Sequence, residues 1–426
     1  MRVVEKSERV AIIEGDCLDV LRKLKAETIH AIVTDPPYGL SREPDMVEVM
    51  KHWLAGDDYV HKGNGFMGKS WDSFVPGPAV WKECLRVLKP GGYLLSFAGS
   101  RTFDLMTLAI RLGGFEIRDS IAWLYGSGFP KSMDVSKAID KAAGATREVI
   151  GLKTYGDGGT FNQGPASGRS AGHMGNVVAR PPSVETTPAT PEAEQWQGWG
   201  TALKPAFEPI IVARKPIRGT VVANVLEHGT GALNIDGCRI EGQGAEPGRV
   251  RHGGGTNGVY ADDEWTKANQ ATMGGPMPSG RWPANVILDE DQAAALDEQS
   301  GRTVSKSGGK STKALGIMND DAWTAKDLPR TGHDDTGGAS RFMYVAKAPK
   351  KERPVVDGVA HPTVKPLALM RWLVRLVTPP DGFVLDPFAG SGTTAEAALL
   401  EGFKTVVIEK EAEHIPLIQL RVRRVE

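Results

Sequence analysis

Short apolar runs alternate with stretches of helical periodicity over the first 125 residues. The run His30 to Thr34 precedes a Pro-Pro turn, a pattern that predicts a buried strand. Residues 79–88 have apolar side chains at helical spacing, and Lys89-Pro90-Gly91-Gly92 after them predicts the end of a helix. Further elements are expected as strands at 93–98 and 117–125 and as a helix at 102–112. Such alternation of strand and helix predicts an α/β sheet with right-handed crossovers.

The same alternation returns near the C-terminus. The pattern there predicts a helix at 367–377, a strand at 383–386, a helix at 394–400 and a strand at 404–408. The α/β fold therefore begins at the N-terminus, is interrupted, and is completed by the C-terminal residues.

The interruption runs from Gly126 to about Ser340 and is rich in Gly, Pro, Ser, Thr and Asn. Two apolar stretches in it predict strands, Phe207 to Ala213 and Trp282 to Leu288. A stretch at 300–319 has basic but no acidic residues, which fits either a solvated loop or a loop that contacts phosphates. We interpret this middle as a loop-rich insertion rather than as another globular core.

Composition narrows the possible classes of protein. The 426 residues include 51 basic and 52 acidic side chains, so the net charge of −1 excludes a polybasic polymer binder but not a locally basic DNA-binding surface. The 3 cysteines show no disulfide or zinc spacing, which favours a reducing compartment and no metal site. We expect no signal peptide and no membrane span, because no apolar run approaches about 20 residues.

A glycine-rich turn follows the predicted strand at 383–386. The segment from Asp386 to Thr394 reads Asp-Pro-Phe-Ala-Gly-Ser-Gly-Thr-Thr, and its glycines let the backbone approach a ligand closely. Glu409 ends the next strand, at the spacing of a carboxylate that binds a ribose diol. No lysine follows the Gly-x-Gly, which disfavours a nucleotide hydrolase, and Ala395 stands where a Rossmann dinucleotide site would have a third glycine.

A second motif, Asp35-Pro36-Pro37-Tyr38, directly follows the first predicted strand. Proline fixes φ and lacks an N–H, so the Pro36 carbonyl is held rigidly beside the Asp35 carboxylate. Two such acceptors could bind both hydrogens of an exocyclic amino group and draw its lone pair out of conjugation with the ring. Tyr38 would stack on the heterocycle, which must flip out of a duplex to reach the site.

Together, the two motifs resemble those of the S-adenosylmethionine-dependent DNA amino-methyltransferases, and their order is similar to that of the β class. The resemblance covers residues 14–132 and 361–425. It implies a Rossmann-like α/β methyltransferase sheet with helices on both faces, interrupted by a target recognition region. The expected parts are a catalytic part at 1–130, an insertion at 131–206, an edge strand at 207–215, a target recognition region at 216–345 and an S-adenosylmethionine-binding part at 346–426.

The family pattern also assigns roles to single residues. Asp35, Pro36, Pro37 and Tyr38 would be catalytic, and Tyr38 and Phe129 would contact the target base. His361, Thr363 and Lys365 resemble the segment that meets the methionine carboxylate, although Thr363 and Pro366 also fit the entry to a helix. The full set expected to contact the cofactor is Asp16, Cys17, Asp35, His361, Thr363, Lys365, Asp386, Phe388, Ala389, Gly390, Ser391, Gly392, Thr393 and Glu409.

The resemblance implies transfer of a methyl group from S-adenosylmethionine to N6 of adenine in double-stranded DNA. An aspartate at the first motif position favours adenine, whereas enzymes acting on the cytosine amino group more often carry serine. N4-cytosine methylation, a non-catalytic DNA-binding relative and an RNA methyltransferase remain as alternatives. The carbon-5 cytosine mechanism lacks its cysteine. We expect a cytoplasmic, nucleoid-associated protein that needs no metal, and the family makes a homodimer a further expectation.

Overall fold

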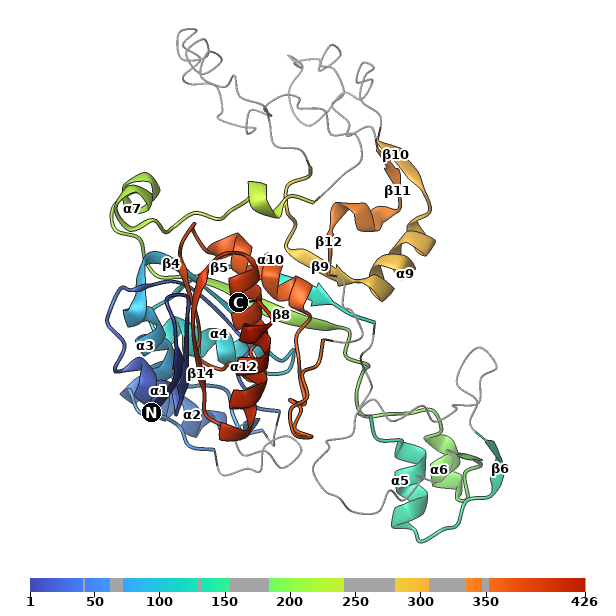
Figure 1. The fold of residues 1–426 in the computed structure, drawn as a ribbon. Coiled ribbons are helices and arrows are strands. Elements are labelled where there is room, and N and C mark those ends of the chain that lie inside the picture. The colour runs from blue at the N-terminus through green and yellow to red at the C-terminus, as the bar shows by residue number, and fades with distance from the viewer. Residues whose placement is uncertain are drawn as a thin grey trace, which may run out of the picture.

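A ten-stranded sheet forms the centre of the molecule (Figure 1). The computed structural model describes residues 1–40, 43–61, 72–126, 128, 132–152, 184–240, 280–305, 335–346 and 352–425. The strand order is β1-β2-β14-β13-β3-β4-β8-β5-β9-β12. In chain order these strands are β1 (Arg2–Lys6), β2 (Val10–Glu14), β3 (Ile29–Thr34), β4 (Leu88–Phe97), β5 (Glu116–Leu124), β8 (Phe207–Arg214), β9 (Val286–Asp289), β12 (Tyr344–Ala346), β13 (Phe383–Asp386) and β14 (Lys404–Glu409).

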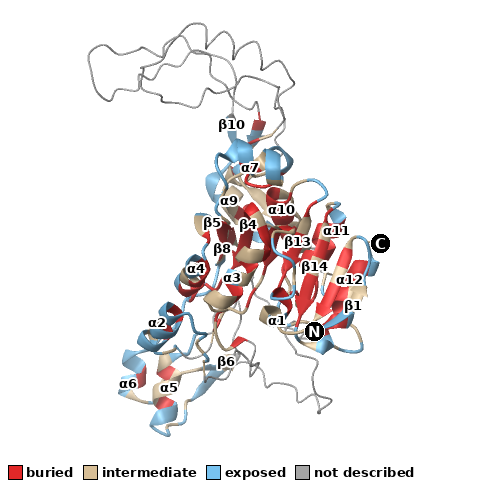
Figure 2. Ribbon diagram, turned by 90° about the vertical axis from the view of Figure 1, so that its left-hand side faces the viewer, coloured by how far each residue is buried: buried red, intermediate tan, exposed pale blue. Residues whose placement is uncertain are grey.

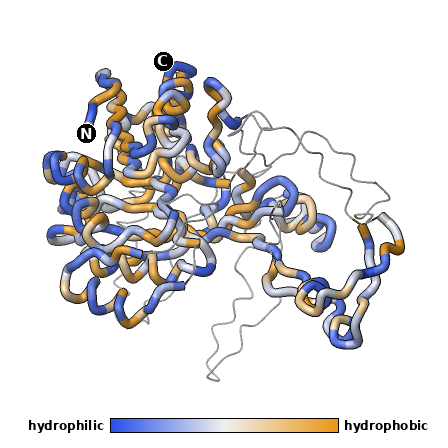
Figure 3. Tube along the Cα trace, turned by 90° about the horizontal axis from the view of Figure 1, so that it is seen from below, coloured by the Kyte–Doolittle hydropathy of each residue, from blue (hydrophilic) through white to orange (hydrophobic). Residues whose placement is uncertain are grey.

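Helices cover both faces of this sheet, as the family resemblance implies. One face packs against α1 (Cys17–Leu21), α3 (Pro78–Val87) and α4 (Phe103–Leu112), and α2 (Met46–Ala55) extends this layer. The other face packs against α10 (Leu367–Val377), α11 (Thr393–Leu400) and α12 (Ile415–Arg423). Figure 2 shows the central strands almost wholly buried between these layers, and Figure 3 shows hydrophobic segments gathered within the α/β core.

The side chains of β3 explain why this strand lies at the centre. Ile32 packs in the hydrophobic cluster on one face, and Ala31 and Val33 pack in the cluster on the other. Successive strand residues point to opposite faces, so a continuous apolar run fits a parallel strand covered by helices on both sides.

Strands from the N-terminal and C-terminal parts of the chain pair with one another within the sheet. Strand β13 pairs in parallel with β3, with Val384 opposite Ala31 and Leu385 opposite Ile32. Strand β14 pairs in parallel with β13 and with β2. The C-terminal strands are therefore inserted between β2 and β3 and complete the fold begun at the N-terminus.

Most predicted elements are present, with small differences at their ends. The predicted helix and strand at 367–377 and 383–386 have the predicted bounds. Strand β4 begins at Leu88, earlier than predicted, because residues 89–92 form an irregular stretch between two paired regions of β3 and β4. The same Pro-Gly-Gly stretch follows the end of α3 at Val87.

The prediction that residues 207–215 form an edge strand is wrong. Strand β8 lies between β4 and β5 and is antiparallel to both. The sheet continues past β5 because β9 pairs with β5 and β12 pairs with β9, which satisfies the backbone groups that β5 would otherwise expose. Strand β9 lies within the expected target recognition region at 216–345, and β12 lies across its C-terminal boundary.

Several elements of the insertions were not predicted. A small unit apart from the sheet contains α5 (Val135–Ala142), α6 (Pro191–Gln195), β6 (Val149–Leu152) and β7 (Val184–Thr186) (Figure 1). Others are α7 (Val221–His228), α9 (Glu290–Ser300), β10 (Thr303–Ser305), β11 (Asp335–Gly337) and the 3-10 turns at 236–238 and 339–342. A further 3-10 turn that was not predicted, at 412–414, lies in the C-terminal part of the core. Within the described ranges, no helix has the length and apolar character needed to cross a membrane.

Candidate active site

The two sequence motifs meet where β3 and β13 end side by side. Thr34, the last residue of β3, donates a hydrogen bond of 2.6 Å from its Oγ1 to Oδ1 of Asp386, the last residue of β13. These residues are 352 positions apart in the chain. The Asp-Pro-Pro-Tyr motif and the glycine-rich turn therefore leave the sheet at one edge, formed by the carboxyl ends of its parallel strands, where ligands bind in such folds.

Asp386 organises this edge from within the protein. Its carboxylate is 2% exposed and also accepts hydrogen bonds from Oγ1 of Thr394, at 2.6 Å, and from the Phe388 N–H, at 3.0 Å. Burial raises the pKa of Asp386 to about 6, although these hydrogen bonds favour the charged form. The carboxylate thus joins β3, the turn and the start of α11.

The turn after β13 requires glycine at two positions. Gly390 and Gly392 have φ values of 52° and 82°, in the left-handed region where other residues are strained. A Cβ on Gly390 would lie 3.1 Å from the His361 ring, and one on Gly392 would lie 2.9 Å from Ile418 Cα. Next to Gly390, the Ala389 N–H donates a hydrogen bond of 2.9 Å to the Ile408 carbonyl. The hydroxyls of Ser391 and Thr393, on either side of Gly392, lie 3.4 Å apart.

Glu409 ends the neighbouring strand β14 and faces the same turn. Its Oε2 accepts the Gly390 N–H at 2.7 Å, and its Oε1 accepts the Glu411 N–H at 2.8 Å. A carboxylate has further acceptor sites on both oxygens, so these two bonds orient the group and leave capacity for a diol.

Pairing of β2 with β14 brings Asp16 and Cys17 next to Glu409, since the Gly15 N–H bonds to the Glu409 carbonyl at 2.9 Å. Asp16 caps α1 by accepting the Leu18 N–H at 3.0 Å. Burial, followed by the Asp16 charge, raises the pKa of Cys17 to about 12, so its thiol stays protonated.

Asp35 and Lys365 form the link between the catalytic motif and the C-terminal part. Nζ of Lys365 donates to Oδ2 of Asp35 at 2.6 Å and lies 3.4 Å from Oε2 of Glu208. Burial opposes the charged form of Lys365, but the two carboxylates outweigh it and raise the pKa of its ammonium group. The other Asp35 oxygen, Oδ1, is buried and has no hydrogen-bond partner among the described residues.

Tyr38 is held by hydrogen bonds to its backbone and to its side-chain hydroxyl. Its backbone N–H donates to Oδ1 of Asp72 at 2.8 Å, and its carbonyl accepts the Thr102 hydroxyl at 2.6 Å. Its own hydroxyl donates to Oε2 of Glu208 at 2.9 Å. Burial, and then the carboxylates of Asp35 and Glu208, raise the pKa of Tyr38 well above its usual value, so the phenol stays neutral.

Of the other residues predicted for the site, only His361 contacts the glycine-rich turn among those that the structure describes. The His361 ring lies 4.7 Å from that of His414, in an edge-on arrangement, and against Gly390. Thr363 is exposed, and Pro366 rather than Thr363 occupies the N-cap of α10, so the helix-entry interpretation of Thr363 is wrong. Glu352 caps α10 instead, by accepting the Leu367 N–H at 2.9 Å. The predicted base contact Phe129 lies outside the described residues.

Sequence reasoning missed two carboxylates in this site, Glu208 and Asp72. Glu208 lies at the start of β8, opposite Trp123 of β5. Because β8 runs antiparallel to its neighbours, its first residues reach the edge at which the parallel strands end. The sequence does carry one signal: Glu208 is the single acid in an otherwise apolar predicted strand. No comparable signal distinguishes Asp72, which approaches Tyr38 only through the tertiary structure.

The fold and this edge define an α/β protein whose N-terminal and C-terminal parts together build one candidate site. The family model of N6/N4 DNA methylases matches residues 29–420, and the chain belongs to this family. Membership confirms the resemblance to DNA amino-methyltransferases, the Rossmann-like α/β class of the fold, and S-adenosylmethionine as the cofactor.

Individual relatives match parts of the chain. A Type II methyltransferase of Haemophilus influenzae, M.HindIII, is 24% identical over 52% of this chain and 64% of its own length. M.HinfI, also from Haemophilus influenzae, is 36% identical over 26% of this chain and 30% of its own length. The DNA adenine methyltransferase YhdJ of Escherichia coli is 44% identical over 13% of this chain and 19% of its own length. The chain therefore spans less than two thirds of these relatives.

Among solved structures, the cytosine-N4-specific PvuII DNA methyltransferase is 14% identical with a TM-score of 0.42, and the alignment covers 99% of this chain and 90% of that one. TTHA0409 of Thermus thermophilus, described as a DNA modification methylase in complex with S-adenosyl-L-methionine, is 16% identical with a TM-score of 0.36, covering 98% and 95% of the two chains.

Proposed function

We propose that this protein methylates the N6 amino group of adenine in double-stranded DNA. The observation that supports this most directly is Asp35 Oδ1, a buried carboxylate oxygen without a partner among the described residues. A buried acceptor left unpaired is costly, and it is retained where a ligand supplies the donor. An exocyclic amino group carries such a donor and also presents a flat ring to Tyr38.

We assign a separate task to each residue of the motif. Asp35 accepts one amino hydrogen through Oδ1 while Lys365 holds Oδ2 at 2.6 Å. We assign the second hydrogen to the Pro36 carbonyl, whose position is restricted by the two prolines. Tyr38 offers the stacking surface. Both acceptors draw the nitrogen lone pair out of the ring and stabilise positive charge as it develops on the nitrogen.

The residues at the glycine-rich turn fit the cofactor. We assign the ribose to Glu409, whose oxygens are oriented by two backbone N–H groups, and the remainder of the nucleoside to Asp16, Cys17 and Phe388. His361, Lys365 and the turn from Asp386 to Thr393 would surround the methionine part. When bound, S-adenosylmethionine supplies an electrophilic methyl group on a sulfonium. The chain's contribution is alignment of this group with the amino nitrogen, which in general lowers a barrier by about 7–11 kcal/mol.

The three cysteines do not suit covalent catalysis. Burial raises the pKa of Cys17 and Cys238 to about 12 and that of Cys84 well above its usual value. A thiol is nucleophilic as the thiolate, which such pKa values suppress at neutral pH. This supports direct transfer to nitrogen and disfavours a carbon-5 cytosine mechanism.

Adenine is preferred over cytosine because Asp35 occupies the first position of the motif, and the local match to an adenine methyltransferase agrees with this preference. Double-stranded DNA remains the proposed partner, with residues 216–345 as the proposed target recognition region. The proposals of a homodimer and of a nucleoid-associated location rest on the family alone.

The test is transfer of labelled methyl groups from S-adenosylmethionine to duplex DNA, followed by digestion to nucleosides and mass spectrometry. We expect N6-methyladenine from the wild-type protein, and sequencing of the modified DNA then identifies the target sequence. Asp35→Ala should abolish transfer while cofactor binding persists. Thr28→Val, far from this edge, serves as a control with normal transfer. N4-methylcytosine as the product would refute the choice of adenine, and undiminished transfer by Asp35→Ala would refute the site.

A further inference from the structure

The ammonium group of Lys365 is shared between two carboxylates, and only one of them belongs to the catalytic motif. Asp35 receives a hydrogen bond of 2.6 Å from Nζ, and Glu208 lies 3.4 Å from the same atom. The side chain of Lys365 is 8% exposed, and those of Asp35 and Glu208 are 23% and 20% exposed. All three charges are thus largely removed from solvent and interact strongly with one another.

The charges of this group do not cancel. Asp35 and Lys365 alone would form a neutral pair, in which the nearby cation weakens the carboxylate as an acceptor. Glu208 restores one negative charge and attracts Lys365 from the other side. A site that carries net negative charge beside Asp35 Oδ1 is suited to a nitrogen that becomes positive as it reacts.

Glu208 also fixes the ring proposed to stack on the base. The Tyr38 hydroxyl donates to Glu208 Oε2 at 2.9 Å, the same oxygen that faces Lys365. Lys365 Nζ lies 5.3 Å from the centre of the Tyr38 ring and 5.0 Å from that of Phe97. One carboxylate oxygen therefore orients the stacking ring and the partner of Asp35 together.

We propose that Glu208 is a positioning residue for methyl transfer, which balances the charge of Lys365 and tethers Tyr38. It touches neither the base nor the cofactor in this assignment and acts through those two side chains. This inference rests on the proposed function, because it concerns the same amino-group site.

Three substitutions separate the balancing of the Lys365 charge from the tethering of Tyr38. Glu208→Gln has nearly the same shape and retains an acceptor for the Tyr38 hydroxyl, but it removes the negative charge. Glu208→Ala removes both the charge and the tether. Tyr38→Phe removes the tether from the other side and keeps the ring. Transfer would be measured with a duplex that contains the target sequence, and base flipping by the fluorescence of 2-aminopurine placed at the target position.

Glu208→Gln should lower kcat by roughly 10- to 100-fold, because alignment and charge at the reacting nitrogen are disturbed. Its KM for DNA, its affinity for S-adenosylmethionine and its 2-aminopurine signal should stay as in the wild type. Glu208→Ala should lower kcat further and also weaken the 2-aminopurine signal. Adding Tyr38→Phe to Glu208→Ala should cause little additional loss, because the tether is already absent.

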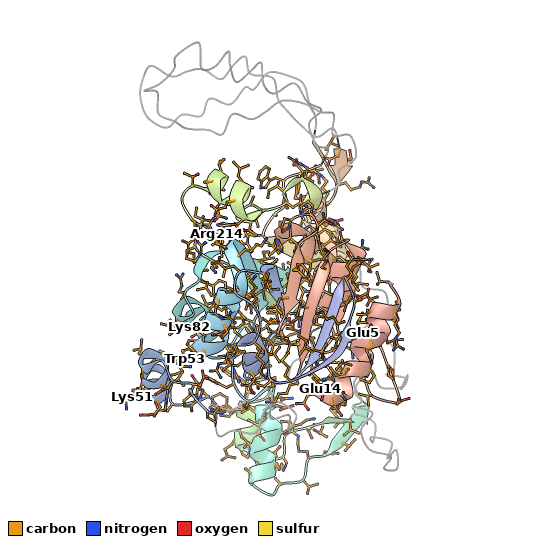
Figure 4. All side chains as sticks on the ribbon, turned by 60° about the vertical axis from the view of Figure 1, so that its left-hand side comes forward. Glu5, Glu14, Lys51, Trp53, Lys82 and Arg214 are labelled. Carbon is orange, nitrogen blue, oxygen red and sulfur yellow. The ribbon has the colours of Figure 1, made fainter. Side chains whose placement is uncertain are left out.

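Glu116→Gln is the matched control. Glu116 of β5 forms an ion pair of 2.7 Å with buried Arg214 of β8. Glu208 lies near the start of β8 and Arg214 is its last residue, so this ion pair lies at the opposite end of the same strand. Figure 4 shows Arg214 far from Glu14, which ends β2 at the site edge. The inference is overturned if wild-type protein methylates DNA and Glu208→Gln matches its kcat, or if Glu116→Gln loses as much. A wild-type protein that transfers no methyl group would instead refute the proposed function itself, and the inference with it.

Discussion

At the residue scale, Asp386 shows that the site contains a buried carboxylate whose burial is costly even though its hydrogen bonds join several elements. Asp386 is 2% exposed, and the hydrogen bonds that it accepts from the described residues come from two hydroxyls and one backbone N–H rather than from a cation. Burial of a carboxylate is unfavourable unless its interactions replace water fully. Its raised pKa shows that they do not, so part of the stability of the fold is given up at this position.

This cost predicts a pH dependence that Asp386→Asn should remove. The pKa of Asp386 is raised from 3.8 to about 6 in the folded protein, so the folded state binds the proton more tightly than the unfolded state does. Stability from this group is present below the unfolded pKa and is lost as the pH rises through about 6. From pH 4 to pH 7, the free energy of unfolding should fall by about 2 kcal/mol more in the wild type than in Asp386→Asn. Urea titrations across this range measure it, and parallel curves for the two proteins would contradict it.

At the element scale, the contact between the glycine-rich turn and α12 determines how α11 leaves the sheet. Gly392 is the N-cap of α11 and has a left-handed φ of 82°. Its missing Cβ is what allows the turn to lie against Ile418, near the start of α12. A turn that approaches another helix so closely cannot accept a larger residue without moving one of the two.

Gly392→Ala should therefore destabilise the protein by more than its backbone conformation alone requires. Gly402 is a matched control, with φ of 83° and nothing within 4 Å of the position that a Cβ would occupy, so Gly402→Ala incurs only the left-handed cost of about 1–2 kcal/mol. Gly392→Ala should lose about 1–3 kcal/mol in addition, from overpacking against α12. Denaturant unfolding of both variants gives the difference. Equal losses would show that α12 yields without cost.

At the scale of the whole molecule, the strand order joins the two ends of the chain into one cooperative core. Strands β13 and β14 lie between β2 and β3, so neither the N-terminal nor the C-terminal part has a complete sheet alone. The buried cluster that contains α10 and α11 also includes residues of β3 and β4. Both ends should consequently fold and unfold together.

This predicts the behaviour of a chain divided between residues 351 and 352. Residues 1–351 alone should lack a cooperative unfolding transition, because β2 and β3 lose the strands between them. Coexpression with residues 352–426 should restore the transition, and binding of S-adenosylmethionine with it. Circular dichroism during urea unfolding is the measurement, and the full chain with an uncut protease site at this point is the control. Cooperative unfolding of residues 1–351 alone would show that the parts are independent.

The sequence by itself determined the parallel core and the residues at its edge. Periodicity located β3, α10 and β13 because these elements are apolar runs with clear turn signals at their ends, and the two motifs follow their strands directly. Family membership confirms the fold class and the cofactor. The roles of the site residues remain predictions, although the structure brings Asp35 and Lys365 into contact across 330 positions.

Only the tertiary structure decided which distant side chains complete the site. The antiparallel pairing of β8 with β5 follows the expectation for these two strands, but the sequence of an apolar strand does not reveal that β8 also pairs with β4. That position brings Glu208 to the edge where Asp35 and Tyr38 lie. The sequence likewise does not reveal that Asp72 lies beside Tyr38. Local sequence encodes periodicity and turns, whereas strand order and direction arise from pairing between segments far apart in the chain.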